Sequence, residues 1–92
     1  MSESIMQDRK ECYITHSTER LHKHHLMRGS HRKAAEKYGC WVWLRNDWHT
    51  DASYSIHNNP RLEMQLRQIC QMNFEKIYGH EKWMQVFGKN YI

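Results

Sequence analysis

The stretch RLHKHHLMRGSHRKAAEKYGCWVWL, residues 20–44, decides the fold of this 92-residue chain. Residues 20–27, which carry a cluster of histidines, predict a short strand. Residues 31–38 are good helix formers followed by Gly39, a residue common just after helices, and they predict a short helix. Residues 41–44 are rich in aromatic and β-branched side chains and predict a second strand. Two strands flanking a short helix indicate a small α+β domain.

The segments outside this stretch complete a single domain. Residues 1–10 are polar with mixed charges and predict a flexible N-terminal tail, so the domain is expected to span residues 11–92. Asn59-Pro60 is a typical helix start, and apolar side chains recur at helical spacing from there to Gly79. A final short helix is expected over residues 81–87. A chain of this length suffices for one domain and not for two.

The composition favours a soluble protein with an anionic partner. The formal net charge of +4 favours nucleic acid, because phosphate neutralisation dominates such binding, although many small basic domains bind nothing anionic. The cysteines Cys12, Cys40 and Cys70 are odd in number and widely spaced, which argues against a disulfide framework or a C-x-x-C pair. No stretch resembles a signal peptide or a membrane span, so we expect a cytoplasmic protein without a membrane partner.

The eight histidines are the most unusual feature of the composition. His24 and His25 are adjacent in the first predicted strand, so their side chains point to opposite faces. One of them can hold a metal ion while the other acts as a base, and phosphodiester hydrolysis needs both functions. His49 and His57 lie in the polar loop 45–58, which a hairpin could return to His24. A surface imidazole without function is the alternative for any one histidine taken alone.

Other polar side chains near this stretch have two interpretations each. We assign His16, His22 and His80 to the surface and leave the role of His31 open. Basic residues surround the paired histidines and fit either a DNA-backbone contact or an ordinary solvated helix face: Arg20, Lys23, Arg28, Arg32, Lys33 and Lys37. Of these, Arg28, Arg32 and Lys33 are the expected nucleic-acid-binding residues. For Trp41 and Trp43, packing in the core is favoured over stacking on bases.

Several motifs together resemble the small phage-encoded HNH endonucleases, also called His-Me finger or ββα-metal nucleases. The motifs are Leu21-His22-Lys23-His24-His25, Arg28-Gly29, Arg32-Lys33, Glu36-Lys37-Tyr38-Gly39, Val42-x-Leu44, His49, Ile56-His57-x-Asn59, and the tail from Tyr78-Gly79 to Phe87-Gly88-Lys89-Asn90-Tyr91. The resemblance covers about residues 11–92, which is nearly the whole chain.

This resemblance implies a ββα-metal core, with a β-hairpin followed by C-terminal helices, that cleaves DNA with one divalent metal ion. His24 falls at the metal-binding position of the paired-histidine motif, and His25 falls at the position of the general base. His49 and His57 fall at further histidines that are expected to ligate the same ion. The ion would be Mg²⁺ or Mn²⁺, and an all-imidazole site also suits Ni²⁺ or Zn²⁺.

The chain departs from the family pattern at the structural zinc site, which two cysteine knuckles usually form. The first knuckle keeps Cys12 but has Thr15 at its partner position, and the second pair is replaced by Arg45 and Trp48. Four ligands are needed for such a site, so no structural zinc is expected. We hypothesise that Trp48, Tyr13 and the Trp41/Trp43 face hold the fold there as an apolar cluster. The middle Asn of the HNH pattern has no obvious counterpart, because Gly39-Cys40 stands at that place.

These observations lead to three functional hypotheses. The first is a metal-dependent DNA endonuclease or nickase, for which the small size makes a homodimer the expected route to double-strand cleavage. The second is a catalytically inactive HNH-derived phage binding module with a host or phage protein as partner, such as an inhibitor of a host defence protein. The third is a nucleic-acid packaging or assembly factor that uses only its charge.

Overall fold

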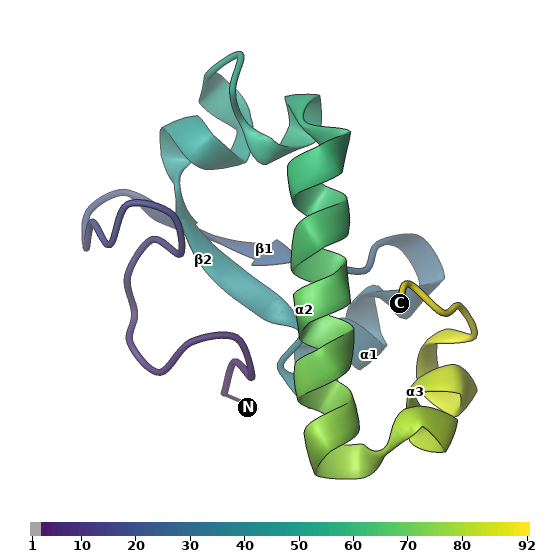
Figure 1. Ribbon diagram of the computed structural model, residues 1–92. Coiled ribbons are helices and arrows are strands. Elements are labelled where there is room, and N and C mark those ends of the chain that lie inside the picture. Colours follow the sequence, from purple (N-terminus) through teal and green to yellow (C-terminus); the bar gives the residue numbers. More distant parts are fainter. Residues whose placement is uncertain (1–2) are drawn as a thin grey trace.

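The computed structural model describes residues 3–92, apart from the side chain at position 51, and shows an α+β protein (Figure 1). Strands β1 (Leu21–His25) and β2 (Trp41–Arg45) form a two-stranded antiparallel sheet. In its register His24 lies opposite Val42 and His25 lies opposite Trp41. The two predicted strands are therefore confirmed, and the imidazoles of His24 and His25 leave opposite faces of the sheet.

A short helical segment joins the two strands. It consists of the 3-10 turn η1 (Gly29–His31) and helix α1 (Arg32–Tyr38), which ends at Gly39 in the left-handed region, at φ 75°. A side chain at position 39 would collide with the backbone carbonyl oxygen of Glu3, so glycine is required there by both conformation and space.

The segment between β2 and the long helix differs from the polar loop that the sequence predicts. It contains two helical turns, the π-turn η2 (Asp47–Asp51) and the 3-10 turn η3 (Ile56–Asn58). Ser55 and Ile56 are buried, which anchors this segment to the core. The turns carry His49 and His57, so their positions are fixed by local backbone structure and not by an extended loop.

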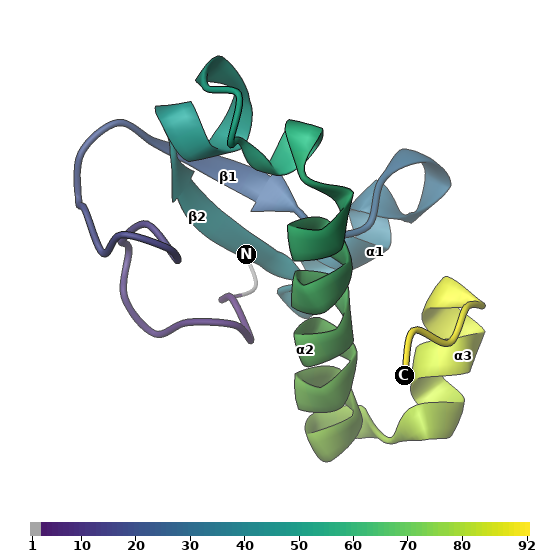
Figure 2. The same cartoon turned by 45° about the horizontal axis from the view of Figure 1, so that its top comes forward.

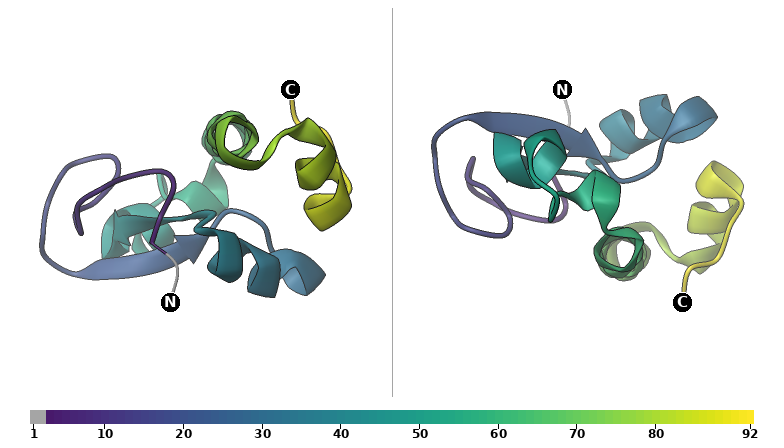
Figure 3. Two further views of the ribbon diagram at one scale, coloured as in Figure 1. Left: turned by 90° about the horizontal axis from the view of Figure 1, so that it is seen from below. Right: turned by 90° about the horizontal axis from the view of Figure 1, so that it is seen from above.

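Helix α2 (Pro60–Tyr78) forms the centre of the molecule, and helix α3 (His80–Phe87) follows it directly. The side chain of Asn59 accepts a hydrogen bond of 3.1 Å from the Leu62 amide, which caps α2 as the sequence predicts. Seen end on, α2 lies between the sheet on one side and α3 on the other (Figure 3). Its buried face therefore contacts both parts of the protein.

The hydrophobic core forms where α2 meets its neighbours. The Phe74 ring lies 5.3 Å from that of Trp83 and 5.4 Å from that of Tyr38, which joins α2 to α3 and α1. Full burial of a phenylalanine side chain contributes about 1.5–3 kcal/mol. The buried residues of this core cluster are Cys12, Leu26, Met27, Ala35, Cys40, Val42, Leu44, Ile56, Leu66, Cys70, Phe74, Trp83 and Phe87, and Trp41 is buried outside it.

The N-terminal segment lies along β2, where the sequence predicts a flexible tail (Figure 2). The Ile5 amide donates to the Gly39 carbonyl at 2.9 Å, and the Trp43 amide donates to Oε1 of Gln7 at 2.7 Å. The bond to Trp43 satisfies a β2 group that the two-stranded sheet leaves unpaired, and the bond to Gly39 holds the turn that precedes the strand. The first two residues lie outside the described part of the chain. Within that part, no helix is long and apolar enough to cross a membrane.

Candidate functional site

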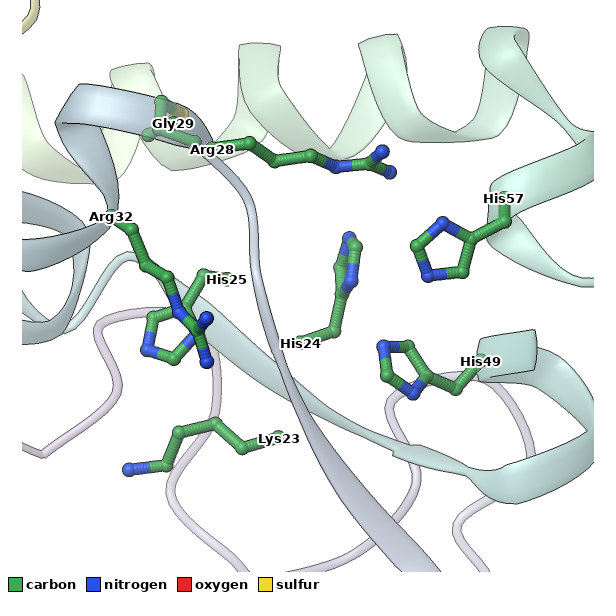
Figure 4. Close-up of a pocket in the computed structure, with 9 residues that line it drawn as sticks. Lys23, His24, His25, Arg28, Gly29, Arg32, His49 and His57 are labelled. Atoms are coloured by element: carbon green, nitrogen blue, oxygen red, sulfur yellow. The ribbon is translucent and has the colours of Figure 1, made fainter.

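Three histidines from three elements meet beside the sheet. His24 comes from β1, His49 from η2 and His57 from η3, and one ring nitrogen of each lies within 4.8 Å of those of the other two. Their ring centroids are separated by 5.3 Å, 5.7 Å and 5.1 Å, and the rings converge on one point from three sides (Figure 4). These are the three residues that the sequence predicts as metal ligands. The arrangement could hold a metal ion, of a kind that the geometry does not define.

The fold explains why these three residues meet. The antiparallel register returns the end of β2 to the start of β1, where the Asn46 amide donates to the Arg20 carbonyl at 2.9 Å. The η2 turn follows at once and holds His49 above the β1 face that carries His24. The η3 turn precedes the Asn59 cap of α2, so the start of that helix fixes His57.

His24 is the buried member of the group, with 3% of its surface exposed. Burial, the nearby His49 and the Arg28 guanidinium together lower the pKa of His24 to about 3. The imidazole is therefore neutral at physiological pH and offers a lone pair. A neutral imidazole is the form that binds metals.

His22 also belongs to the site, although the sequence analysis assigns it to the surface. Its Nδ1 lies 3.2 Å from Nδ1 of His49, at hydrogen-bond distance. His22 is exposed, but it shares a strand face with His24 because side chains two positions apart in a strand point to the same side. That alternation is the signal that could have identified it.

His25 points away from the three histidines and is held by α1. Its Nε2 lies 3.0 Å from Oε1 of Glu36, and Lys23 Nζ lies 3.2 Å from the same oxygen. The hydrogen bond from His25, assisted by Lys23, lowers the pKa of Glu36 below its ordinary value. Because an ionised carboxylate can only accept, Nε2 carries the proton and the lone pair of His25 is on Nδ1. Glu36 was not identified from the sequence as a site residue.

An open pocket of about 320 Å³ contains both the three-histidine group and His25. Lys23, Arg28 and Arg32 give its wall positive charge. The other predicted nucleic-acid-binding residue, Lys33, is exposed and does not line the pocket. In Figure 4 the side chain of Arg28 extends across the pocket above His24. Of the three predicted nucleic-acid-binding residues, Arg28 and Arg32 therefore lie at the site and Lys33 lies outside it.

A polar network holds the region where the family pattern would place a structural zinc. Arg45 Nε and Nη2 donate to the carboxylate of Asp47 at 2.6 Å and 2.8 Å, and the Tyr54 hydroxyl donates to it at 2.5 Å. The Thr15 amide donates to Sγ of Cys12 at 3.4 Å. Burial raises the pKa of the Cys12 thiol, but hydrogen bonds from Thr15 and neighbouring backbone groups outweigh it, and the pKa lies below its ordinary value.

The apolar cluster hypothesised for this region is present in part, because Tyr13 and Trp48 pack against the hydrophobic core and Trp41 is buried. Among the described residues, the aromatic side chains form two ring pairs instead of one cluster, Trp48 with Tyr54 at 4.6 Å and Trp41 with Trp43 at 5.4 Å. Lys23 Nζ lies 4.2 Å from the Trp41 ring centroid, so the second pair packs beneath a cation. The hydrogen-bonded Arg45 and Asp47 add polar contacts to this apolar packing.

A comparison of the chain with protein-family models, curated proteins and solved structures finds no match.

Proposed function

We propose that this protein is a metal-dependent DNA endonuclease or nickase of the HNH, ββα-metal type. The observation that carries the proposal is the pairing of two sites in one basic pocket. Three histidines suited to a metal ion lie on one face of β1, and a carboxylate-held histidine lies on the other. Phosphodiester hydrolysis requires both a metal ion that stabilises negative charge and a base that accepts a proton from water.

The three imidazoles fit a divalent metal ion. Three neutral ligands leave coordination positions for water and a phosphate oxygen, which distinguishes a catalytic site from a closed structural one. When bound, the ion would stabilise negative charge on the phosphate and on the leaving oxygen. His24, His49 and His57 would hold it. Imidazole ligands favour Zn²⁺ or Ni²⁺, while Mg²⁺ and Mn²⁺ prefer oxygen ligands, so the ion has to be identified by measurement.

His25 would act as the general base toward an attacking water molecule. Its Nε2 proton is donated to Glu36, which leaves Nδ1 to accept the proton of water. The ionised carboxylate also stabilises the imidazolium that this transfer creates. Glu36 in turn is fixed by Lys23, so the base is oriented by two side chains. This arrangement supplies an orienting group where the sequence lacks an obvious middle Asn.

Arg28 and Arg32 would hold the DNA backbone across the pocket. Both are exposed and line the pocket next to the histidines, where a guanidinium can donate two hydrogen bonds to one phosphate. Lys33 would contribute only diffuse charge, because it lies outside the pocket. The expected partner is therefore DNA bound through its phosphates. Cleavage of both strands would need a second copy of the chain.

A protein-binding module without catalysis is the second candidate. Its support is the exposed outer side of α2, where Met64 and Met72 are 38% and 45% exposed. Flexible methionines on a surface suit contact with another protein. Such a module, for example a phage inhibitor of a host defence protein, would not depend on His25.

Nicking of supercoiled plasmid with Mg²⁺, Mn²⁺, Ni²⁺ and Zn²⁺ in turn tests the proposal. The comparison is wild type against His25→Ala, with Lys33→Ala as a matched control outside the pocket. We expect nicking that chelator and His25→Ala abolish and that Lys33→Ala leaves nearly intact. A folded wild-type protein that nicks with none of these ions would contradict the proposal and favour the binding module.

A further inference from the structure

Glu63 is a buried carboxylate that belongs to no role described so far. It lies in the first turn of α2 with 8% of its surface exposed. Burial of an ionised carboxylate is unfavourable unless other groups compensate its charge. Glu63 therefore needs an explanation in terms of its partners.

Two of these partners are arginines. Oε1 of Glu63 accepts from Arg67 Nη2 at 2.5 Å, and Oε2 accepts from Arg28. Arg67 also donates through Nε to the Leu26 carbonyl at 2.7 Å, just beyond the end of β1. Arg67 thus fixes the Glu63 carboxylate relative to the strand that carries His24.

The third neighbour is His24 itself. Its Nε2 lies 3.7 Å from Oε2 of Glu63. This nitrogen is buried, and it has no hydrogen-bond partner within the described part of the chain. In Figure 4 the His24 ring points toward the guanidinium of Arg28, the residue that Glu63 binds. A hydrogen bond between these two atoms would be about 3 Å long. Nε2 of His24 and Oε2 of Glu63 would therefore have to approach by less than 1 Å to form one.

We propose that Glu63 is the positioning residue of His24: it accepts the Nε2 proton and leaves Nδ1 as the metal-binding nitrogen. Histidines that ligate metals commonly donate their second ring proton to a carboxylate, which fixes the tautomer and the ring orientation. Rotation of the His24 ring by a small angle, or release of Arg28 to a phosphate, would close the gap. This inference rests on the proposed metal site and assigns the ligand atom within it.

Two other roles for Glu63 are distinguishable from this one. Glu63 could serve only as an ion-pair hub for Arg28 and Arg67, in which case the His24 tautomer would not depend on it. Alternatively Nε2 could be the ligand atom, with Glu63 Oε2 as an additional ligand to the same ion. The tautomer of His24 separates the proposed role from ligation through Nε2, because only the proposed role combines a proton on Nε2 with a lone pair on Nδ1 at the metal. The hub role is separated by the zinc affinity of variants, because a hub without contact to His24 would affect that affinity only through the fold.

The decisive measurement is the long-range ¹H–¹⁵N spectrum of the ¹⁵N-histidine-labelled protein, first without metal and then with one equivalent of Zn²⁺. We expect Nε2 of His24 to be protonated in both states and Nδ1 to shift on addition of zinc. A proton on Nδ1 in either state would overturn the assignment. This spectrum needs no variant, so it stands even where a substitution prevents folding.

Zinc titration calorimetry of two variants provides the second measurement. Glu63→Gln should weaken zinc binding about 10–100-fold, the usual effect of removing such an acceptor. Arg67→Met removes the partner of Oε1 and the anchor to Leu26 but leaves Oε2 in place, so it should lower the melting temperature and weaken zinc binding less than Glu63→Gln does. Equal losses of zinc affinity in both variants would show that Glu63 acts only as a structural hub.

The failure of the metal site and the failure of this inference would look different. A wild-type protein in which zinc shifts none of His24, His49 and His57 would contradict the proposed function. The metal-free spectrum would still show whether Nε2 of His24 carries the proton that Glu63 is proposed to accept.

Discussion

Acidification should destabilise the metal-free protein because of one residue, His24. The folded protein keeps this imidazole neutral, with a pKa of about 3, whereas an unfolded chain titrates near the ordinary value of 6.5. At a pH between these two pKa values, His24 is protonated in the unfolded state and neutral in the folded state. The contribution of His24 to stability is therefore complete above pH 6.5 and is lost progressively as the pH falls toward 3.

The size of the effect follows from the distance between the two pKa values. One pKa unit corresponds to about 1.4 kcal/mol, so a fall to a pH about 2 units below the unfolded value costs about 2.7 kcal/mol. This figure requires only that the folded pKa lies well below the pH of measurement. A domain of this size has a free energy of unfolding of about 5–15 kcal/mol, so this loss is a substantial part of it. Because each kcal/mol shifts the melting temperature of such a domain by about 4–8 °C, the melting temperature should fall by roughly 10–20 °C.

Urea unfolding of wild type and His24→Gln, in chelator, at neutral pH and at a pH near 4.5, tests this reasoning. Both proteins keep the same other titratable groups, so the difference between the two pH dependences isolates His24. We expect wild type to lose about 2.7 kcal/mol more than the variant. Parallel losses in the two proteins would refute the idea of a buried, neutral His24.

Three further predictions concern the remaining residues. Glu36→Gln should lower the rate constant of DNA nicking about 10–100-fold with unchanged zinc affinity. A matching loss of zinc affinity would mean that Glu36 supports the whole site. Arg32→Ala should weaken DNA binding and reduce its salt dependence by about one phosphate contact, whereas Lys33→Ala should change both less. Fluorescence anisotropy at several salt concentrations measures both quantities. Equal effects of the two substitutions would contradict the binding of DNA across the pocket. Gly39→Ala and Gly29→Ala both place a side chain at positive φ and should each cost about 1–2 kcal/mol, but Gly39→Ala should cost more, because its Cβ meets the Glu3 backbone and that of Gly29 meets nothing. Equal melting temperatures of these two variants would indicate that the N-terminal segment does not pack on β2 in solution.

The sequence was sufficient to predict the two strands, the three α-helices and the three histidines that meet beside the sheet. The alternation of a strand separates His24 from His25, and this follows from backbone geometry wherever the strand lies. The Asn59-Pro60 start of the long helix is equally local, because the cap and the first turn involve neighbouring residues. Predictions of this kind succeed because the interactions concerned span only a few positions of the chain.

Only the tertiary structure identified the carboxylates around the histidines. Glu36 and Glu63 lie on helices, where a charged residue is expected simply to face water, and nothing in their local sequence distinguishes them from Glu75 or Glu81. Glu63 reaches His24 only because α2 docks beside β1 through Arg67, and Glu36 reaches His25 only because α1 folds back over the strand. The sequence by itself thus identified the histidines that are candidates for binding a metal or moving a proton, since that depends on chemical type and local spacing. The tertiary structure decided which groups orient them, since that depends on contacts between elements distant in the chain.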